Sequence, residues 1–399
     1  RVLFRSLPAG EAFDLQVVMV PTNGAAGDLK RIDLTLGLDG TPGMVLDSIE
    51  VESAVALELV VNSTGDLPAK DPTGCCCDTG RTLSDGTPEC SLRAAIQIAN
   101  AHPGKDIIRF DIPSDDPNYF GGIPLIPPRD ALPDITDPVI IDGGSQNPQS
   151  TRPAIELSGA KIKRPPPPSP GQVEFGEDLL DWSGAAMGLK VLAPESEIRG
   201  LVVNSFPLCG IGLGPEANHS ILQGNFIGTD TTGTSPLANG FGADSEEFLR
   251  GCGILVTSSD NLIGGDHGNL ISGVTGTIWN DTPMLTLLAP PGIFIATPAA
   301  TGNQVLGNIL GLDVNGTEYM QEAVAADGTL RTAVAGVWIA SSPGNSVGGF
   351  SRPDAAGSTA GNLIGANGVG VLITGAEATG NQVSGNVIGV VSDSPSGAI

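Results

Sequence analysis

The stretch of sequence that decides the fold is Gly370-Val371-Leu372-Ile373, followed after a polar segment by Asn381-Gln382-Val383-Ser384-Gly385-Asn386-Val387-Ile388-Gly389. Its three short apolar runs are separated by Gly, Asn and Ser residues, which are typical of turns. Three short strands joined by turns form one triangular coil of about 20–25 residues, the length of one solenoid layer. The stretch therefore predicts one coil of a right-handed parallel β-helix.

The same pattern occurs five times from residue 198 onward, with a Gly that opens an apolar strand and two Asn residues behind it. Equivalent strands of successive coils pair in parallel about 4.8 Å apart, so inward-facing Ile, Val and Leu stack into a continuous core. Stacked Asn side chains can hydrogen-bond to one another, and we expect such a ladder at the second Asn position. The opening glycines are Gly210, Gly253, Gly292, Gly336 and Gly370; the first asparagines are Asn218, Asn261, Asn303, Asn345 and Asn381; and the second are Asn225, Asn269, Asn308, Asn362 and Asn386.

Long loops interrupt the repeats. Successive opening glycines are 43, 39, 44 and 34 residues apart, which exceeds the length of one coil. Most of the extra residues follow the second Asn strand, so the loops are expected to cluster along one side of the stack, the favoured place for a function. They span residues 229–251, 274–291, 312–335 and 350–361.

A short helix is predicted before the repeats, over residues 91–101. Leu92, Ala95, Ile96 and Ala99 follow helical spacing and give one narrow apolar face. We expect this helix to cover the N-terminal opening of the stack, with Leu92, Ile96 and Ala99 facing inward, because an open coil exposes backbone groups and core.

The first residues of the chain predict strands of another kind. Residues 13–17 and 32–36 alternate apolar and polar positions, as half-buried strands do. Four or five strands fit before residue 58, fewer than a complete sandwich needs. We therefore predict an all-β chain in three parts: a small β-sandwich-like module (1–58), a Cys-bearing loop with the capping helix (59–104) and a parallel β-helix with side loops (105–399).

Six cysteines, at positions 75, 76, 77, 90, 209 and 252, indicate disulfides in an oxidising compartment, so we expect an extracellular or cell-surface protein. Cys209 and Cys252 each stand directly before the opening Gly of adjacent coils. Equivalent positions lie about 4.8 Å apart, within the Cα separation that a disulfide spans. We predict a Cys209–Cys252 bridge, and a bridge from Cys90 to one of the three clustered cysteines.

The segment around Cys90 resembles a known family. Residues 89–100 (ECSLRAAIQIAN) resemble the CSLREA-type motif that opens many secreted bacterial β-helix proteins, with Ala94 where the family often has Glu. The resemblance covers about residues 59–399 and implies a large extracellular protein without established catalytic residues. It also implies Cys77 as the partner of Cys90, although the family usually has one Cys where this chain has three. Residues 1–58 resemble strands of a cohesin-like or immunoglobulin-like module. Residues 61–66, 77–80, 141–144, 198–201 and 224–230 resemble other segments of the CSLREA family.

The net charge of the chain limits the classes of partner that it can bind. The chain has 19 Lys and Arg against 44 Asp and Glu, a net charge of −25, which would repel nucleic acid phosphates and anionic polysaccharide and also favours solubility. We expect no nucleic acid partner. No apolar run reaches the roughly 18 residues of a membrane span. Calcium could accompany loop carboxylates, and Asp66, Asp71 and Asp78 are candidate ligands without an ordered spacing. Cell-surface or matrix glycans remain a further class of partner.

Two classes of function compete. Parallel β-helices host polysaccharide lyases, glycosidases and epimerases, but that argument is an analogy of fold. From Glu197 onward the chain has no Lys and only four Arg, and the Gly-led strands carry no acid. An enzyme would depend on loop carboxylates facing each other across a groove. The loop and turn acids are Asp230, Asp244, Glu246, Glu247, Asp260 and Asp266.

A structural or adhesive role needs only a rigid rod with side loops. The predicted helix covers the N-terminal opening of the stack. At the other end a regular coil is followed by residues 390–399, which contain a short polar run and no comparable cap. Residues 1–58 contain too few strands for a complete sandwich. A head-to-tail contact between these ends would satisfy both and generate a fibre. We therefore expect a segment or subunit of a surface stalk or filament that assembles end to end, with a polysaccharide-active enzyme as the alternative. The alternative to assembly is that further coils or domains follow in a longer gene product.

Overall fold

The structure is a computed structural model that describes residues 30–37, 45–53, 56–74, 76–163, 186–240, 251–273, 291–320, 335–349, 361–365 and 368–389. The chain divides into two compact units, Arg1–Val55 and Ala56–Ile399. They are described separately.

The first unit contains one antiparallel strand pair, β1 (Lys30–Gly37) with β2 (Val45–Ser53). The register opposes Ile32 to Val51 and Leu34 to Ile49. β1 includes the strand expected over residues 32–36, while the strand expected over 13–17 lies outside the described residues. The sandwich-like module thus stays a prediction.

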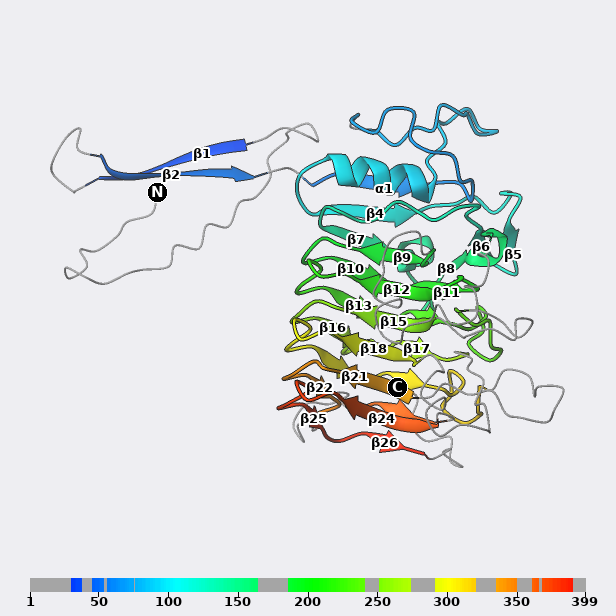
Figure 1. Ribbon diagram of the computed structural model, residues 1–399. Helices are drawn as coiled ribbons and strands as arrows, with labels where there is room; N and C mark the ends of the chain where they lie inside the picture. Colours follow the sequence, from blue (N-terminus) through cyan, green and yellow to red (C-terminus); the bar gives the residue numbers. More distant parts are fainter. Residues whose placement is uncertain are drawn as a thin grey trace. The chain divides into compact units, whose positions relative to one another are not determined.

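The second unit is a right-handed parallel β-helix of three sheets, as the repeats predicted (Figure 1). Sheet 1 contains β3 (Glu58–Val61), β4 (Asp106–Phe110), β7 (Val139–Asp142), β10 (Glu197–Arg199), β13 (Ile221–Gln223), β16 (Leu262–Gly264), β19 (Gln304–Leu306), β22 (Ser346–Val347) and β25 (Gln382–Val383). Sheet 2 contains β5 (Tyr119–Phe120), β6 (Ile123–Ile126), β8 (Ile155–Ser158), β11 (Leu201–Asn204), β14 (Phe226–Ile227), β17 (Leu270–Ile271), β20 (Ile309–Leu310), β23 (Leu363–Ile364) and β26 (Val387–Ile388). Sheet 3 contains β9 (Leu189–Val191), β12 (Cys209–Leu213), β15 (Cys252–Val256), β18 (Ile293–Ala296), β21 (Ala335–Ala340) and β24 (Val369–Thr374).

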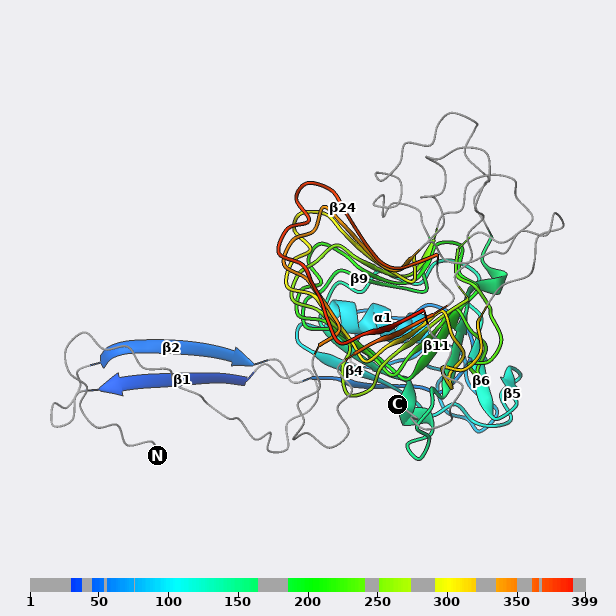
Figure 2. The same cartoon turned by 90° about the horizontal axis from the view of Figure 1, so that it is seen from below.

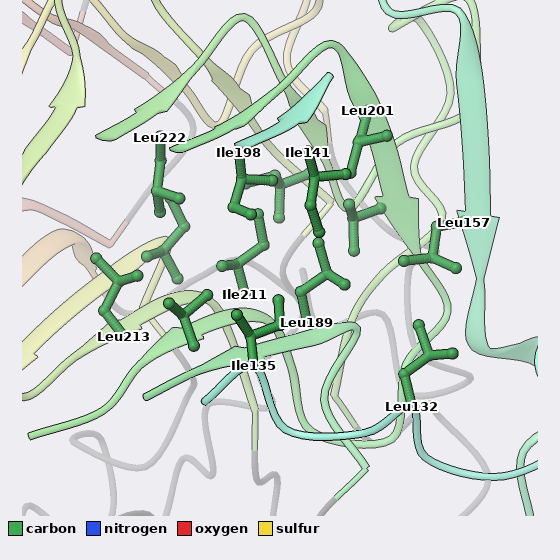
Figure 3. Close-up of a cluster of buried hydrophobic side chains, with 14 of the residues drawn as sticks. Leu132, Ile135, Ile141, Leu157, Leu189, Ile198, Leu201, Ile211, Leu213 and Leu222 are labelled. Atoms are coloured by element: carbon green, nitrogen blue, oxygen red, sulfur yellow. The ribbon is translucent and has the colours of Figure 1, made fainter. Parts of the chain in front are cut away.

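The five Gly-led runs form consecutive strands of sheet 3, so the repeat and the coil coincide. Ile254 pairs with Ile293, which pairs with Val337, and these inward-facing side chains are fully buried. Figure 3 shows how Ile141, Ile198 and their neighbours from all three sides meet inside the coil. Two short 3-10 turns, Gly143–Gln146 and Gly159–Lys161, follow β7 and β8.

The opening glycines are required because successive coils approach closely. A Cβ atom at Gly253 would lie 2.5 Å from the carbonyl oxygen of Gly292, closer than real contacts allow. Gly292 in turn leaves 2.7 Å between such a Cβ and the carbonyl oxygen of Gly336. Gly is therefore needed for space at these positions, not for a left-handed backbone.

The predicted helix is α1 (Leu92–Ala101), and Ser91 caps it by accepting a hydrogen bond from the backbone N–H of Ala94 at 3.0 Å. The helix contacts β3 and β4, and its apolar face joins the same core as theirs. Leu92, Ile96 and Ala99 are buried as expected. Seen along the stack, α1 lies within the outline of the coils (Figure 2), as a cap on the N-terminal opening does.

Candidate functional site

Two disulfides join the cysteines that the sequence and the family resemblance pointed to. Cys209 and Cys252 are register partners in β12 and β15, with Cα atoms 4.5 Å apart. Cys77 and Cys90 are bridged with Cα atoms 5.1 Å apart, beside the start of α1. Cys75 lies outside the described residues.

An asparagine ladder runs along the corner before sheet 2, at the second Asn of each repeat. From Asn269 onward, each Oδ1 accepts the backbone N–H of the Asn one coil earlier, at 2.9–3.0 Å, and Asn225 Oδ1 accepts the Leu201 N–H at 3.1 Å. Each Nδ2 also donates to a main-chain carbonyl of the preceding coil, as Asn308 does to Ile263 at 2.8 Å. The buried amides are therefore fully engaged, which fixes the corner geometry. The members are Asn225, Asn269, Asn308, Asn362 and Asn386.

A second ladder, which was not predicted from the sequence, runs along the corner before sheet 1. It uses the first Asn of the last four repeats, with backbone N–H to Oδ1 distances of 2.8–3.0 Å. Toward the N-terminus, the backbone N–H of Ser220 donates to Asn261 Oδ1, and that of Ser196 donates to Ser220 Oγ. In the first coil, Asp106 Oδ1 accepts the backbone N–H of Leu57 in the same way. The recurring first Asn was the available signal, but its function as a rung follows only from the register. The Asn members are Asn261, Asn303, Asn345 and Asn381.

Both ladders have a direction. In every coil the backbone N–H of the rung points to the next coil, whose side-chain oxygen accepts it. At the last described coil, the backbone N–H groups of Asn381 and Asn386 have no recorded acceptor among the described residues. The C-terminal end of the ladders is therefore an end with unused donors.

The last described coil also exposes its core. β24, β25 and β26 form the end of the three sheets opposite α1 (Figure 1), and no further strand pairs with them among the described residues. Their inward positions carry apolar side chains, as in every earlier coil. The exposed fractions are 40% at Ile373, 42% at Val383 and 45% at Ile388, against 0% at Ile339, 0% at Val347 and 1% at Ile364 in the coil before. Residues 390–399 lie outside the described residues. We call the surface formed by β24, β25 and β26 the open end.

Two short hairpins form the described parts of the side loops. Thr229 bridges to Pro236 and Leu312 to Tyr319, and the two hairpins touch through the Val314 N–H and the Gly233 carbonyl at 2.9 Å. They lie on the outer side of sheet 2, whose outward Phe226 and Leu270 are buried. The remaining loop residues, and most of the predicted loop clustering, fall outside the described residues.

Two described loop acids hold turns, while Asp260 and Asp266 are exposed. Asp230 Oδ1 accepts the backbone N–H groups of Thr234 and Ser235, and Asp313 does the same for Thr317 and Glu318. Burial opposes ionisation of Asp313, but these backbone donors prevail and hold its pKa below the ordinary value. Neither carboxylate is placed as a proton donor. Asp244, Glu246 and Glu247 lie outside the described residues.

A carboxylate pair does meet on the outer face of sheet 1, but both members bind one guanidinium. Arg199 contacts Asp142 at 2.9 Å and Glu197 at 2.7 Å. The hydrogen bond to Asp142 is the main reason that the pKa of Arg199 is raised, so the side chain stays charged. Gln223 donates to Glu197 at 2.8 Å. The arrangement neutralises charge along the sheet and leaves neither carboxylate positioned for acid–base catalysis.

The three calcium candidates have other partners. Asp66 forms an ion pair with Arg93 at 2.9 Å, Asp71 accepts from Thr73, and Asp78 accepts from the Gly80 N–H. In the part of the chain that the structure describes, no group of three or more His, Cys, Asp or Glu residues could hold a metal ion. The structure thus gives these carboxylates turn and ion-pair roles. Within the same residues, no helix is long and apolar enough to cross a membrane.

A buried titratable group lies at the end of α1. His102 Nδ1 is 3.3 Å from Asp106 Oδ1, and Asp106 Oδ2 is buried without a hydrogen-bond partner. Burial raises the pKa of the Asp106 carboxyl, with the His102 charge acting in the opposite direction. Burial likewise raises the pKa of Asp137, which accepts the Gly104 N–H at 3.0 Å.

This burial predicts a pH-dependent stability that Asp106→Asn removes. A carboxyl with a raised pKa contributes stability that is complete in acid and is lost as pH rises through that pKa. Asn cannot ionise and keeps an oxygen for the Leu57 N–H. The melting temperature of the variant should therefore rise relative to that of the parent as the pH is raised from about 4, the ordinary pKa of Asp, toward neutral. Thermal unfolding across this range, with the exposed Asp111→Asn as control, checks it; a difference that is constant with pH would contradict it.

Comparisons with known proteins add little to these observations. Neither a protein-family profile nor a curated protein matches the sequence. Among solved structures, the chain is similar to the crystal structure of pectate lyase Pel9A, with 14% identity over 82% of this chain and 80% of that chain and a TM-score of 0.24. A likeness at this level carries no argument about activity, and the fold rests on the strand pairing itself.

Proposed function

We propose that the chain is an extracellular structural or adhesive protein, a segment or subunit of a surface stalk or filament that associates end to end. The observation that supports this proposal is the last described coil, where inward Ile373, Val383 and Ile388 are exposed, among the described residues, although their partners one coil earlier are buried. Unpaired strand edges beside exposed core side chains are a template for pairing with another chain.

Other features agree with this function. Disulfides are typical of secreted and cell-surface proteins, and the CSLREA-type resemblance points to the same location. The alternative, a polysaccharide-active enzyme, would depend on other loop carboxylates, because Asp230, Asp313, Asp142 and Glu197 are engaged elsewhere. These are the exposed Asp260 and Asp266 and the acids outside the described residues. The stack of coils itself supplies what a rod requires, a continuous core along one axis.

Val383→Lys is expected to abolish self-association of the full chain. The substitution places a charge on the exposed core side of β25, where a covering segment would bury the charge. Because Val383 is already 42% exposed, folding of the chain should be little affected. Sedimentation velocity over a range of concentrations measures the result, with the melting temperature as the check on folding.

Gln382→Lys is the matched control, since it adds the same charge to the neighbouring residue of the same strand. Gln382 pairs with Ser346, on the outer side of the sheet. It should associate like the parent. A parent chain that stays monomeric at every concentration would refute the proposal, as would equal behaviour of the two variants.

A further inference from the structure

The capping helix α1 is attached differently at its two ends. The Cys77–Cys90 disulfide lies just before its start, and Arg93 in its first turn pairs with Asp66 at 2.9 Å. At its other end, Asn100 bonds to the chain segment before β7, and three titratable side chains lie beside it. We call these side chains the acid–histidine cluster: His102, Asp106 and Asp137. A covalent bond thus secures the start of the helix, whereas its end depends in part on groups that gain and lose protons.

Two buried atoms of the cluster lack hydrogen-bond partners among the described residues. They are Asp106 Oδ2 and His102 Nδ1, which lies 3.3 Å from the other oxygen of the carboxyl, Oδ1. Asp106 Oδ1 accepts the Leu57 N–H at 2.7 Å, and the Asp106 side chain is fully buried. Buried polar atoms without partners are destabilising. A proton on Asp106 Oδ2 would serve both atoms, because it makes Oδ2 a donor and leaves the imidazole nitrogen as its acceptor.

The charges within the cluster also favour its protonated form. Burial is the main reason that the pKa of the Asp106 carboxyl is raised, and the negative charge of Asp137 raises this pKa further. Burial raises the pKa of Asp137 as well, and its Oδ2 accepts the Gly104 N–H at 3.0 Å. The positive charge of His102 acts in the opposite direction on both carboxyls. Two partly desolvated carboxyls therefore share one cation at the end of α1.

Other charged residues of the surrounding segments have partners of their own. Arg93 is the only other charged residue of α1, and it pairs with Asp66. Lys105, directly before Asp106 in the chain, is exposed. The charged residues of β3, of the segment before β7 and of β7 form pairs on the outer surface: Glu58–Arg109, Asp134–Lys190 and Asp142–Arg199. The protonation of Asp106 is thus governed by the cluster itself.

Loss of protons from the cluster weakens the attachment of the helix end. A carboxyl with a raised pKa contributes stability that is complete in acid and is lost as pH rises through that pKa. His102 is also the C-cap of α1, and its backbone N–H donates to the Ala99 carbonyl at 3.2 Å. A positive charge there stabilises the helix through its dipole, and imidazole loses its charge between about pH 5 and about pH 8. Both effects act in one direction as pH rises.

We propose that the acid–histidine cluster is a pH-sensitive latch, which holds the end of α1 against the first coil when protonated and releases that end when deprotonated. The disulfide keeps the start of the helix in place throughout. Release uncovers the core side of the first coil, where Leu59 and Val61 pack in the same cluster as Leu92 and Ile96. It also uncovers an edge of β3, which pairs only with β4 among the described strands, and an uncovered strand edge can pair with another chain.

Hydrogen–deuterium exchange of the full chain between about pH 5 and about pH 8 tests the latch. After correction for the pH dependence of chemical exchange, the protection of residues 96–102 should fall about tenfold or more as pH rises, which corresponds to about one pKa unit. Protection of β15, buried several coils away, should stay constant. Constant protection at the end of α1 would overturn the inference, and so would an equal loss in β15, which would mean global unfolding.

Two variants of the cluster and one control complete the test. Asp106→Asn should keep residues 96–102 protected at every pH, because Asn cannot ionise, keeps an oxygen for the Leu57 N–H and offers an amide N–H to His102. His102→Asn, which removes the imidazole but leaves Asp106 in place, should reduce the pH dependence. His267→Gln removes an exposed histidine and should behave like the parent. A pH dependence that survives in both cluster variants, or that His267→Gln also removes, would overturn the inference.

Discussion

Asn308→Ala is expected to lower the free energy of unfolding of the β-helix by about 3 kcal/mol or more, because it leaves buried polar groups without partners. Asn308 Oδ1 accepts two bonds from Asn269, at 3.0 Å each, and its Nδ2 donates to Ile263 at 2.8 Å and to Asn362 at 2.9 Å. Removing this side chain leaves the Asn269 N–H inside the stack with nothing to bind and takes a side-chain donor from the Ile263 carbonyl. Urea unfolding followed by circular dichroism measures the loss.

The control for this prediction comes from the same coil. Gln304 is exposed on the outer side of β19, two residues before Leu306, and Gln304→Ala should change stability by no more than about 0.5 kcal/mol. Asn386→Ala, at the end of the same ladder, should cost less than Asn308→Ala because its outer side meets no further rung. Equal effects of the three variants would mean that the ladder contributes little to stability.

Ile96→Asp is expected to destabilise the protein by about 4 kcal/mol or more, since it buries an unpaired carboxylate and removes an apolar side chain from the core. Ile96 lies in the middle of α1, is 1% exposed and belongs to the core that includes Ile108 and Ile141. The cap would have to leave the first coil or neutralise the acid. Thermal unfolding gives the shift directly.

Ala101→Asp provides a matched substitution on the same helix. Ala101 is the exposed last residue of α1, so the added charge stays in water. It acts only on the C-terminal end of the helix dipole, at a cost of about 0.5 kcal/mol. If Ile96→Asp and Ala101→Asp melt at the same temperature, α1 does not act as the cap of the stack.

The elements that the sequence predicted best are those whose residues repeat. The Gly-led runs fix sheet 3, because each copy contains the same three short strands, whatever the length of its side loop, and so lies beside the next copy. The second Asn could be assigned to a ladder for the same reason. Asp106 could not be recognised as a rung from the sequence, since the early coils are irregular and only the register aligns its side chain with Leu57. The pairing of Asp142 with Arg199 likewise joins residues 57 apart that share no pattern.

The Cys209–Cys252 disulfide has a mechanical consequence for the β-helix when it is placed under tension. Each coil of a solenoid contacts chiefly its neighbours, so tension on the last coil can peel β24 and then β21 and β18 from the stack in order. Unspooling from that direction stops at β15, because the covalent bridge ties this strand to β12. The two cysteines are 43 positions apart, and the segment between them is a closed loop that cannot extend under load. The bridge therefore divides the rod into a segment that can lengthen under force and an anchored segment that keeps its length.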